Sequence, residues 1–149
     1  MKIHLPHFAA LLPLLFAACN SILYTEEDRM RNNINDFASA YFNWQYKEAL
    51  PFCTPESERW LRFAASNVTQ EDVDLLRAQQ EGASHKIDSI NYDKGDTTAT
   101  AYITVKNFLQ ADSIDTPAHM VKRARICIPL VLRNKKWLVK MEVPLQSEK

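Results

Sequence analysis

The chain has 149 residues and carries 18 basic and 18 acidic side chains, so its formal net charge at neutral pH is zero. This balance gives no electrostatic reason to expect nucleic acid as a partner. The chain has only two glycines, which excludes the glycine-rich loops that cradle phosphates in nucleotide-binding enzymes.

The first 18 residues have the pattern of a secretory signal peptide. Lys2 precedes an apolar run over 3–16 that is too short to span a bilayer as a helix. The small pair Ala17-Ala18 suits cleavage by a signal peptidase. The alternative is a buried N-terminal core helix, but two prolines lie within the run and would interrupt such a helix.

The segment 15–19, Leu-Phe-Ala-Ala-Cys, resembles the lipobox of bacterial lipoproteins. The resemblance implies that Cys19 becomes the first residue of the mature chain and carries a diacylglycerol and usually a further acyl chain such as palmitate. It implies a cell-envelope location, on the periplasmic face of the inner or outer membrane or on the cell surface. The predicted organisation is a lipoprotein signal peptide over 1–18, a lipid-anchored tether over 19–25, one domain over 26–145 and a C-terminal tail over 146–149.

Cys53 and Cys127 are the other two cysteines. Two cysteines do not make a disulfide framework, and neither lies at a spacing typical of a metal site. We therefore expect no metal and no cofactor. The pair is interpreted either as two buried thiols or as one disulfide in an oxidising envelope.

Helical segments are predicted in the first half of the domain. Those starting at Thr25 and Thr69 each have a capping threonine followed three residues later by an aspartate. A second helical piece over 44–52 should end or kink at Pro51, and the sequence Thr-Pro-Glu over 54–56 should start a third. The apolar residues at helical spacing are Met30, Ile34, Phe37, Ala38, Tyr41 and Phe42 in the first helix, Trp60, Leu61 and Ala64 in the third, and Val73 and Leu76 in the last.

Beyond Gly82 the apolar period changes from that of a helix to that of a strand. Strands are predicted over 84–92, 97–109 and 118–132, separated by a turn at 93–96 and a loop over 110–117. A turn at 133–135 leads to a last strand that Pro144 closes, with Trp137, Val139, Met141 and Val143 on one face. Helices followed by an antiparallel meander indicate an α+β fold, with the helices packed on one face of a curled sheet.

At this level the chain resembles the NTF2-like (cystatin-like superfold) families, in particular small bacterial lipoproteins with a DUF4878-like domain. The resemblance rests on three features: an aromatic cluster at the end of the first helix, the connection from Lys47 to Ser57 with its Cys-Thr-Pro-Glu-Ser segment, and the final hairpin with Trp137. It implies a curled sheet closed by helices around a conical, largely apolar cavity. It implies no particular activity, because one such fold hosts enzymes, ligand binders and scaffolds.

Aromatic residues are expected to line this cavity and would suit a flat apolar ligand. The alternative is that they fill it as an ordinary core. The candidate lining residues are Tyr41, Trp44, Trp60, Tyr92, Phe108 and Trp137.

Catalysis on this fold would require an ionisable group inside the cavity. The alternating residues expected to face inward are all apolar, so we expect a non-catalytic domain. An enzyme of the isomerase, dehydratase or hydrolase type is the alternative, with a carboxylate such as Asp72 or Asp74, or one of the histidines His85 and His119, as the acting group. Both histidines are otherwise interpreted as solvated side chains near strand ends.

The segment 126–132 is apolar on both faces, and helices can cover only one. Cys127, Pro129 and Val131 on the other face are therefore predicted to form a homodimer or partner-protein interface. The alternative is a short strand shielded by a loop. Basic clusters at 122–125 and 133–136 are interpreted as solvated edges or as contacts to an anionic headgroup or glycan.

The triplets around Ser113 and Ser89, each Asp-Ser-Ile, resemble an O-glycosylation acceptor of one bacterial phylum, and Ser113 is favoured because it lies in a predicted loop. Altogether the sequence indicates a lipid-anchored envelope protein whose domain binds a small apolar ligand or an envelope protein. The alternatives are the small enzyme described above and a structural subunit of an envelope complex.

Overall fold

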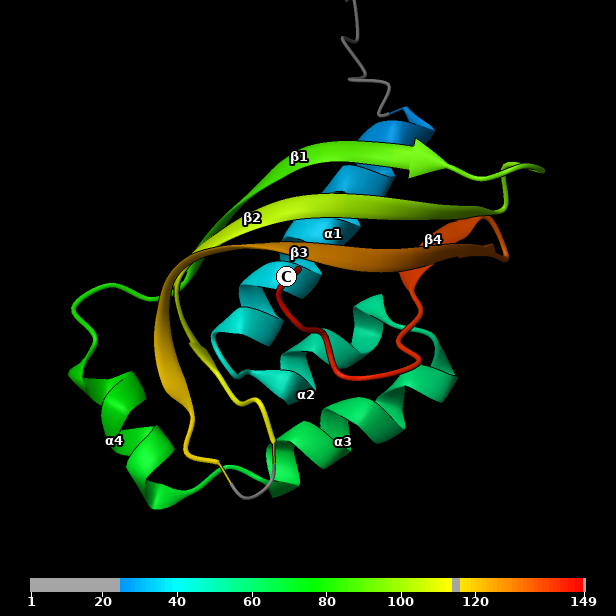
Figure 1. Cartoon of the computed structure of the whole chain (residues 1–149). Coiled ribbons are helices and arrows are strands. Elements are labelled where there is room, and N and C mark those ends of the chain that lie inside the picture. The colour runs from blue at the N-terminus through cyan, green and yellow to red at the C-terminus, as the bar shows by residue number, and fades with distance from the viewer. Residues whose placement is uncertain (1–24, 114–115, 149) are drawn as a thin grey trace, which may run out of the picture.

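The computed structural model describes residues 25–113 and 116–148 (Figure 1). The predicted signal peptide, the predicted acylation site Cys19 and Ile114 of the second Asp-Ser-Ile triplet lie outside the described residues. Within the described part of the chain, no helix is both long enough and apolar enough to cross a membrane.

Helices come first and strands second, as the sequence predicted (Figure 1). The sheet has four antiparallel strands in the order β1-β2-β3-β4. The fold is α+β, which confirms the predicted class. The elements are α1 (Glu26–Phe42), α2 (Tyr46–Ala49), η1 (Leu50–Phe52), η2 (Pro55–Ser57), α3 (Glu58–Ser66), α4 (Gln70–Ala78), β1 (Ser84–Tyr92), β2 (Thr98–Gln110), β3 (His119–Arg133) and β4 (Lys136–Val139).

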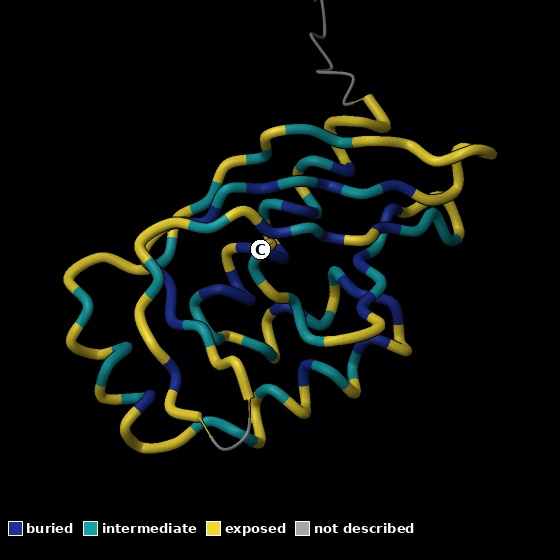
Figure 2. Tube along the Cα trace, viewed as in Figure 1, coloured by how far each residue is buried: buried dark blue, intermediate teal, exposed yellow. Residues whose placement is uncertain are grey.

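The core lies between α1 and the concave face of the sheet. Buried and more exposed positions alternate along β2, as the tube in Figure 2 shows, so one face of the strand is apolar. Register pairs such as Ala101↔Ile128 place the inward residues of β2 and β3 side by side. The buried inward residues of these two strands are Ala99, Ala101, Ile103, Val105, Ile126, Ile128 and Leu130, all expected from the sequence; Leu132 is half-buried.

The sheet is curled at a defined position in β2. Asn107 has a φ of 54°, in the left-handed region that asparagine tolerates better than most residues. After it, Phe108 and Leu109 are both buried, so the strict alternation of the strand ends there. The far ends of β2 and β3 bend away from the flat part of the sheet (Figure 1).

Helix α1 begins as predicted, with a capping box. The Thr25 hydroxyl accepts a hydrogen bond from the Asp28 amide, and the Asp28 carboxylate accepts from the Thr25 amide. Helix α4 starts in the same way at Thr69 and Asp72. The segment 44–52 was predicted as one helical piece. In the structure it forms two short helices, α2 and η1, and Trp44 is not helical.

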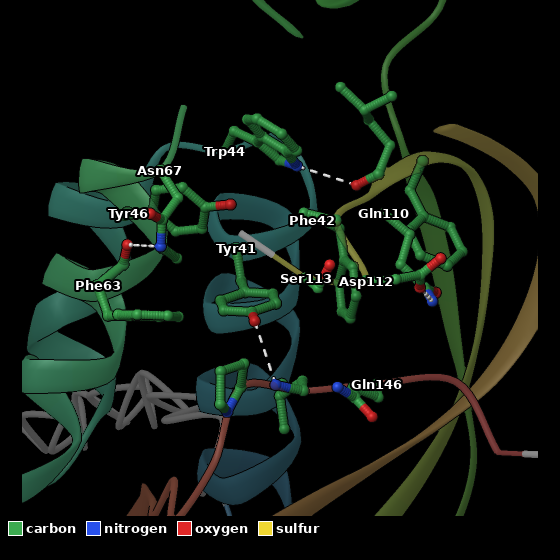
Figure 3. A pocket seen from close by; sticks show the side chains of 16 residues that line it. Tyr41, Phe42, Trp44, Tyr46, Phe63, Asn67, Gln110, Asp112, Ser113 and Gln146 are labelled. Atoms are coloured by element: carbon green, nitrogen blue, oxygen red, sulfur yellow. Dashed lines mark hydrogen bonds between the residues drawn. The ribbon is translucent and has the colours of Figure 1, made fainter. Parts of the chain in front are cut away.

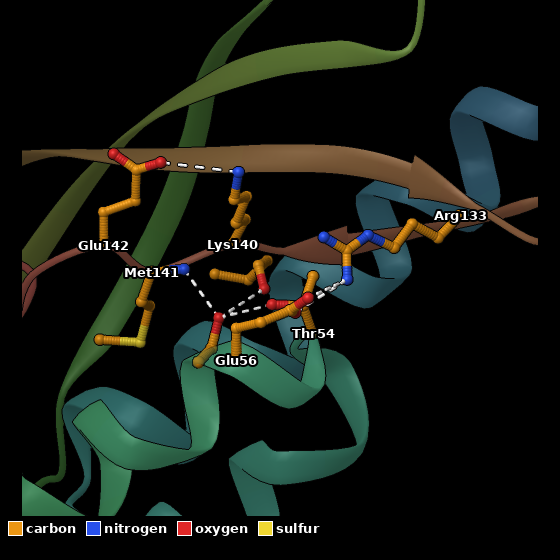
Figure 4. A network of polar contacts seen from close by, with 8 residues as sticks. Thr54, Glu56, Arg133, Lys140, Met141 and Glu142 are labelled. Carbon is orange, nitrogen blue, oxygen red and sulfur yellow. Dashed lines mark hydrogen bonds and ion pairs between the residues drawn. The ribbon is translucent and has the colours of Figure 1, made fainter.

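The prediction that the last strand runs on to Val143 was wrong. Strand β4 ends at Val139, and although Met141 is buried, Val143 is 63% exposed. The reason is a buried polar network (Figure 4): the Met141 amide donates to Ser57 Oγ at 2.8 Å, and Ser57 Oγ donates to the Val139 carbonyl at 3.2 Å. The Ser57 hydroxyl therefore satisfies the backbone of 139–141 in place of a neighbouring strand, and the chain leaves the sheet after Val139.

Residues 146–148, predicted as a tail, pair with β3. Ser147 forms an antiparallel bridge with Ile126, and the Glu148 amide donates to the Arg125 carbonyl at 2.9 Å. The carboxylate of Glu148 accepts from Cys127 Sγ. This short pairing holds the C-terminal segment against the edge of the sheet, beside the end of α1.

Candidate ligand pocket

A pocket of about 390 Å³ lies at the C-terminal end of α1 (Figure 3). Its walls come from α1 and α2 on one side, α3 on another, the bent end of β2 with the loop after it, and the C-terminal segment. The volume is in the range of small-molecule sites. The lining residues are Tyr41, Phe42, Trp44, Tyr46, Phe63, Ala64, Asn67, Phe108, Leu109, Gln110, Ala111, Asp112, Ser113, Pro144, Leu145 and Gln146.

The end of α1 places Trp44 in this pocket. The Trp44 amide donates to the Tyr41 carbonyl at 3.1 Å and the Gln45 amide to the Ala40 carbonyl at 2.9 Å, which is the Schellman pattern of a helix C-terminus. Trp44 occupies the left-handed position of that motif, with a φ of 60°. Glycine is the usual residue there, and a bulky side chain costs about 1 to 2 kcal/mol.

The Trp44 indole is also fixed at its other end. Its Nε1 donates a hydrogen bond to the Leu109 carbonyl on β2 at 3.0 Å (Figure 3). The hydrogen bond joins the end of the helix to the bent end of the sheet across the top of the pocket. The strained backbone and the satisfied indole together hold one flat ring in a single position.

Six of the residues that line the pocket are aromatic. Tyr41 contacts Phe42 edge-on with ring centroids 5.1 Å apart, and Tyr46 in the same way at 5.6 Å. Phe42 meets Phe108 of β2 at 5.4 Å. These edge-to-face contacts are favourable for aromatic rings, so the wall is rigid and apolar.

Burial raises the pKa of both tyrosines in the wall. It raises the pKa of Tyr41 to about 12, although a hydrogen bond from the Leu145 amide to the Tyr41 hydroxyl opposes this rise. Burial also raises the pKa of Tyr46 far above its ordinary value, and the nearby Tyr41 and Asp72 add to the effect. Both hydroxyls therefore remain protonated at neutral pH.

The rim of the pocket is polar, and four of its side chains are already paired. Gln110 Nε2 donates to the Asp112 carboxylate at 2.7 Å, and the other carboxylate oxygen of Asp112 lies 3.4 Å from His119 Nδ1. Ser113 Oγ shares a hydrogen bond with Thr116 at 2.7 Å. Asn67 donates to the Phe63 carbonyl. The rim thus presents polar groups around an apolar interior.

Three of the six predicted lining residues, Tyr41, Trp44 and Phe108, meet in this pocket. Trp60 lies on α3 and packs edge-on against Phe63, and its buried indole N–H has no hydrogen-bond partner within 25–113 and 116–148. Tyr92 and Trp137 pack against each other, with centroids 5.7 Å apart, and Trp137 lines a second pocket near the start of α1.

Several lining residues were missed in the sequence. Tyr46 was placed within a predicted helix but not in the cavity, and Phe63 lies three residues after Trp60 on α3, a spacing that shares a helix face. The sequence therefore contained a signal that could have identified Tyr46 and Phe63 as lining residues. Pro144, Leu145 and Gln146 had none, since they belong to an irregular segment placed by its pairing with β3.

The ionisable residues proposed for catalysis lie elsewhere. Asp72 is the buried capping carboxylate of α4, and Asp74 is exposed and accepts a hydrogen bond from Gln70. His85 Nε2 lies 3.0 Å from Asn35 Oδ1, and burial lowers the pKa of His85. His119 is at the pocket rim through its contact with Asp112, but does not line the pocket. Among the described residues, no group of three or more His, Cys, Asp or Glu side chains could hold a metal ion.

The predicted interface residues lie on the outer face of β3. Pro129 is exposed, while Cys127 and Val131 are half-buried. Their register partners on β2 are Tyr102, Thr100 and Thr98. The Arg125 guanidinium lies over the Tyr102 ring, 4.6 Å from its centroid. The surface is therefore mixed rather than continuously apolar.

The remaining sequence predictions fall on cysteines and serines. Cys53 is buried and Cys127 half-buried, and both are free thiols; burial raises the pKa of Cys53 to about 12. Ser113 is exposed in the loop after β2. Ser89 is half-buried in β1, where the register with β2 shifts.

The sequence matches no protein-family model, and no curated protein is significantly similar to it. The DUF4878-like resemblance therefore rests on sequence motifs alone. Among solved structures, the chain is similar to a candidate NTF2-like transpeptidase from Campylobacter jejuni, with 14% identity, a TM-score of 0.48, and coverage of 75% of this chain and 97% of that one.

Two further solved structures are similar. For the intermembrane-space region of the chloroplast protein ARC6, the identity is 11% and the TM-score 0.45, over 82% of this chain and 95% of that one. For an NTF2-like protein involved in plasmid conjugation, the identity is 13% and the TM-score 0.31, over 80% of this chain and 49% of that one. With TM-scores below 0.5, none of the three assigns this chain to a family.

Proposed function

We propose that this chain is a lipid-anchored envelope protein whose domain binds a flat, largely apolar small molecule, without catalysing a reaction on it. The observation that carries the proposal is the pocket at the end of α1. Its aromatic side chains are Tyr41, Phe42, Trp44, Tyr46, Phe63 and Phe108.

The position of Trp44 favours binding over simple packing. An ordinary helix end would use glycine at this position and avoid the strain. Here the strained residue is a tryptophan whose ring forms part of a pocket wall and whose N–H is satisfied by Leu109. Strain of this kind persists where the surrounding structure requires the residue.

The polar groups of the pocket favour a non-catalytic role. Asp112 is the one carboxylate among the described lining residues; it is half exposed and is engaged with Gln110 and His119. Tyr41 and Tyr46 have raised pKa values and cannot serve as bases near neutral pH. A turnover that is lost on Asp112→Asn would instead support the enzyme alternative.

Two substitutions on α3 test the pocket. Ala64 lines it, whereas the next residue, Ala65, is exposed and does not. The probe is N-phenyl-1-naphthylamine, a neutral flat aromatic molecule, and the readout is the Trp44 indole N–H signal in NMR spectra of the isotope-labelled chain. We expect a saturable shift in the wild type and in Ala65→Phe, and its loss in Ala64→Phe, because the added ring fills the pocket. Equal binding by both variants would contradict the proposal.

The lipid anchor has its own test. Labelling of growing cells with palmitate should mark the wild-type chain and leave Cys19→Ser unmarked. Labelling of both chains, or of neither, would remove the anchor from the proposal while leaving the pocket untouched.

A further inference from the structure

A second pocket, of about 290 Å³, lies at the opposite end of α1 from the aromatic one. It is formed by the first turns of α1, the segment around η1 and the hairpin between β3 and β4. The lining residues are Glu26, Arg29, Asn33, Pro51, Phe52, Lys135, Lys136, Trp137 and Leu138. We call it the cationic pocket.

The charges of this pocket are unbalanced. Arg29, Lys135 and Lys136 are exposed, and none of them forms an ion pair with any residue in the described ranges 25–113 and 116–148. Glu26 is the only acid among the described residues that line the pocket, and its carboxylate accepts the Trp137 indole N–H at 3.1 Å. Three cations against one carboxylate leave an excess of two positive charges.

Neighbouring basic residues are paired, which sets these three apart. Arg133, two residues before Lys135, makes two hydrogen bonds of 2.8 Å to the carboxylate of Glu56 (Figure 4). Arg31 pairs with Glu27 at 2.9 Å. The local acids are therefore committed to other partners, and the excess charge of the cationic pocket is available to a ligand.

The hairpin holds Lys135 in a costly conformation. Asn134 and Lys135 form a two-residue turn between the paired residues Arg133 and Lys136, with φ values of 50° and 63°. Such turns strongly favour glycine at the second position, and a lysine there costs about 1 to 2 kcal/mol. Two aromatic residues, Phe52 and Trp137, also line the pocket.

We propose that the cationic pocket binds a phosphate group that carries an apolar substituent, as in a phospholipid headgroup. Arginine and lysine are the side chains that recognise phosphate, and the aromatic lining residues Phe52 and Trp137 suit the attached carbon chain. The predicted acylation site, Cys19, precedes Glu26 by seven residues, which can span at most about 25 Å. A lipidated chain would thus hold this pocket within reach of the headgroups. The inference does not depend on the aromatic pocket.

The test compares two sets of three substitutions. The pocket set is Arg29→Gln, Lys135→Gln and Lys136→Gln. The control set, Lys86→Gln, Lys106→Gln and Arg123→Gln, removes the same charge from exposed positions on β1, β2 and β3 that also lack ion pairs among the described residues. The full chain is kept in a non-ionic detergent and titrated with dihexanoylphosphatidylglycerol and, separately, with inorganic phosphate, while the Trp137 indole N–H signal is followed by NMR.

We expect the short-chain lipid to shift the Trp137 signal saturably in the wild type and in the control set, and to bind about tenfold more weakly or worse to the pocket set, since three charge-assisted contacts are lost. A response to the lipid alone supports a phospholipid, whereas an equal response to inorganic phosphate would show that the pocket recognises phosphate without an apolar substituent and would overturn the phospholipid assignment. No shift with either ligand, or equal weakening in both sets, would overturn the proposal.

Discussion

The two ends of α1 carry pockets of opposite chemistry. At its C-terminal end, Tyr41, Phe42 and Trp44 face an apolar space whose rim groups are already hydrogen-bonded. At its N-terminal end, Arg29 faces a space with an excess of positive charge. A helix of 17 residues separates them by about 25 Å. One rigid element can therefore present a neutral site and a charged site without either perturbing the other.

The central part of α1 should determine whether both sites exist at all. Phe37 is fully buried and stacks on Tyr41 with centroids 5.3 Å apart. Phe37→Ala should lower the free energy of unfolding by about 3 to 5 kcal/mol, because it leaves a cavity beneath the helix. Urea unfolding followed by tryptophan fluorescence measures this change.

Phe63→Ala is the matched control, since Phe63 is 40% exposed and lines only the aromatic pocket. It should cost much less stability while weakening binding of the naphthylamine probe. If Phe37→Ala were no more destabilising than Phe63→Ala, α1 would not be the element that supports both pockets.

A smaller loss of stability is expected for substitution of Gly82, which lies against Asn43 at the C-terminal end of α1. A Cβ added there would lie 2.5 Å from Asn43 Oδ1. Asn43 would have to rotate and lose its hydrogen bonds to the Ala83 amide, at 2.9 Å, and carbonyl, at 3.3 Å. Gly82→Ala should therefore cost about 1 kcal/mol in unfolding free energy and shift the NMR signal of Trp44 but not that of Trp137.

The double variant isolates the cause. In an Asn43→Ala background the clash is absent, so Gly82→Ala should cost nothing further. An undiminished cost in that background would show that Gly82 acts through some contact other than Asn43.

The smallest change in stability is expected at Trp44. In Trp44→Gly, relief of about 1 to 2 kcal/mol of backbone strain offsets the lost packing and the lost hydrogen bond to Leu109. Stability in urea unfolding should thus change little, while probe binding at the aromatic pocket, followed in this variant by the fluorescence of the naphthylamine itself, is lost. A large loss of stability would mean that Trp44 is retained for packing rather than for the pocket.

Local patterns made much of the fold predictable. Capping boxes at Thr25 and Thr69, apolar spacing in α1 and alternation in β2 each involve residues close in sequence, and the structure bears them out. The last strand was predicted too long because Ser57, more than eighty residues away, accepts the Met141 amide. No sequence pattern near Met141 could indicate that contact.

The membership of the pockets was harder to predict for a geometric reason. Phe108 pairs with Val121 and Trp137 with Leu132, so the two aromatic residues are eleven residues apart along β3. At about 3.3 Å per residue this is roughly 35 Å of strand. An odd separation would place them on opposite faces of a strictly alternating sheet, so Phe108 joins the inner face only because the alternation of β2 breaks at Asn107. The sequence pattern also does not say which end of a long strand each residue occupies. The cationic pocket joins three segments distant in sequence, and it was foreseen only as a basic cluster at 133–136.

The most direct test that the two ends of α1 carry separate sites uses one labelled sample of the full chain and both ligands. The indole N–H signals of Trp44 and Trp137 report on the two pockets separately. We predict that N-phenyl-1-naphthylamine shifts the Trp44 signal alone and that dihexanoylphosphatidylglycerol shifts the Trp137 signal alone. If either ligand moved both signals equally, or moved only the signal of the other pocket, the assignment of two independent sites to the two ends of α1 would be wrong.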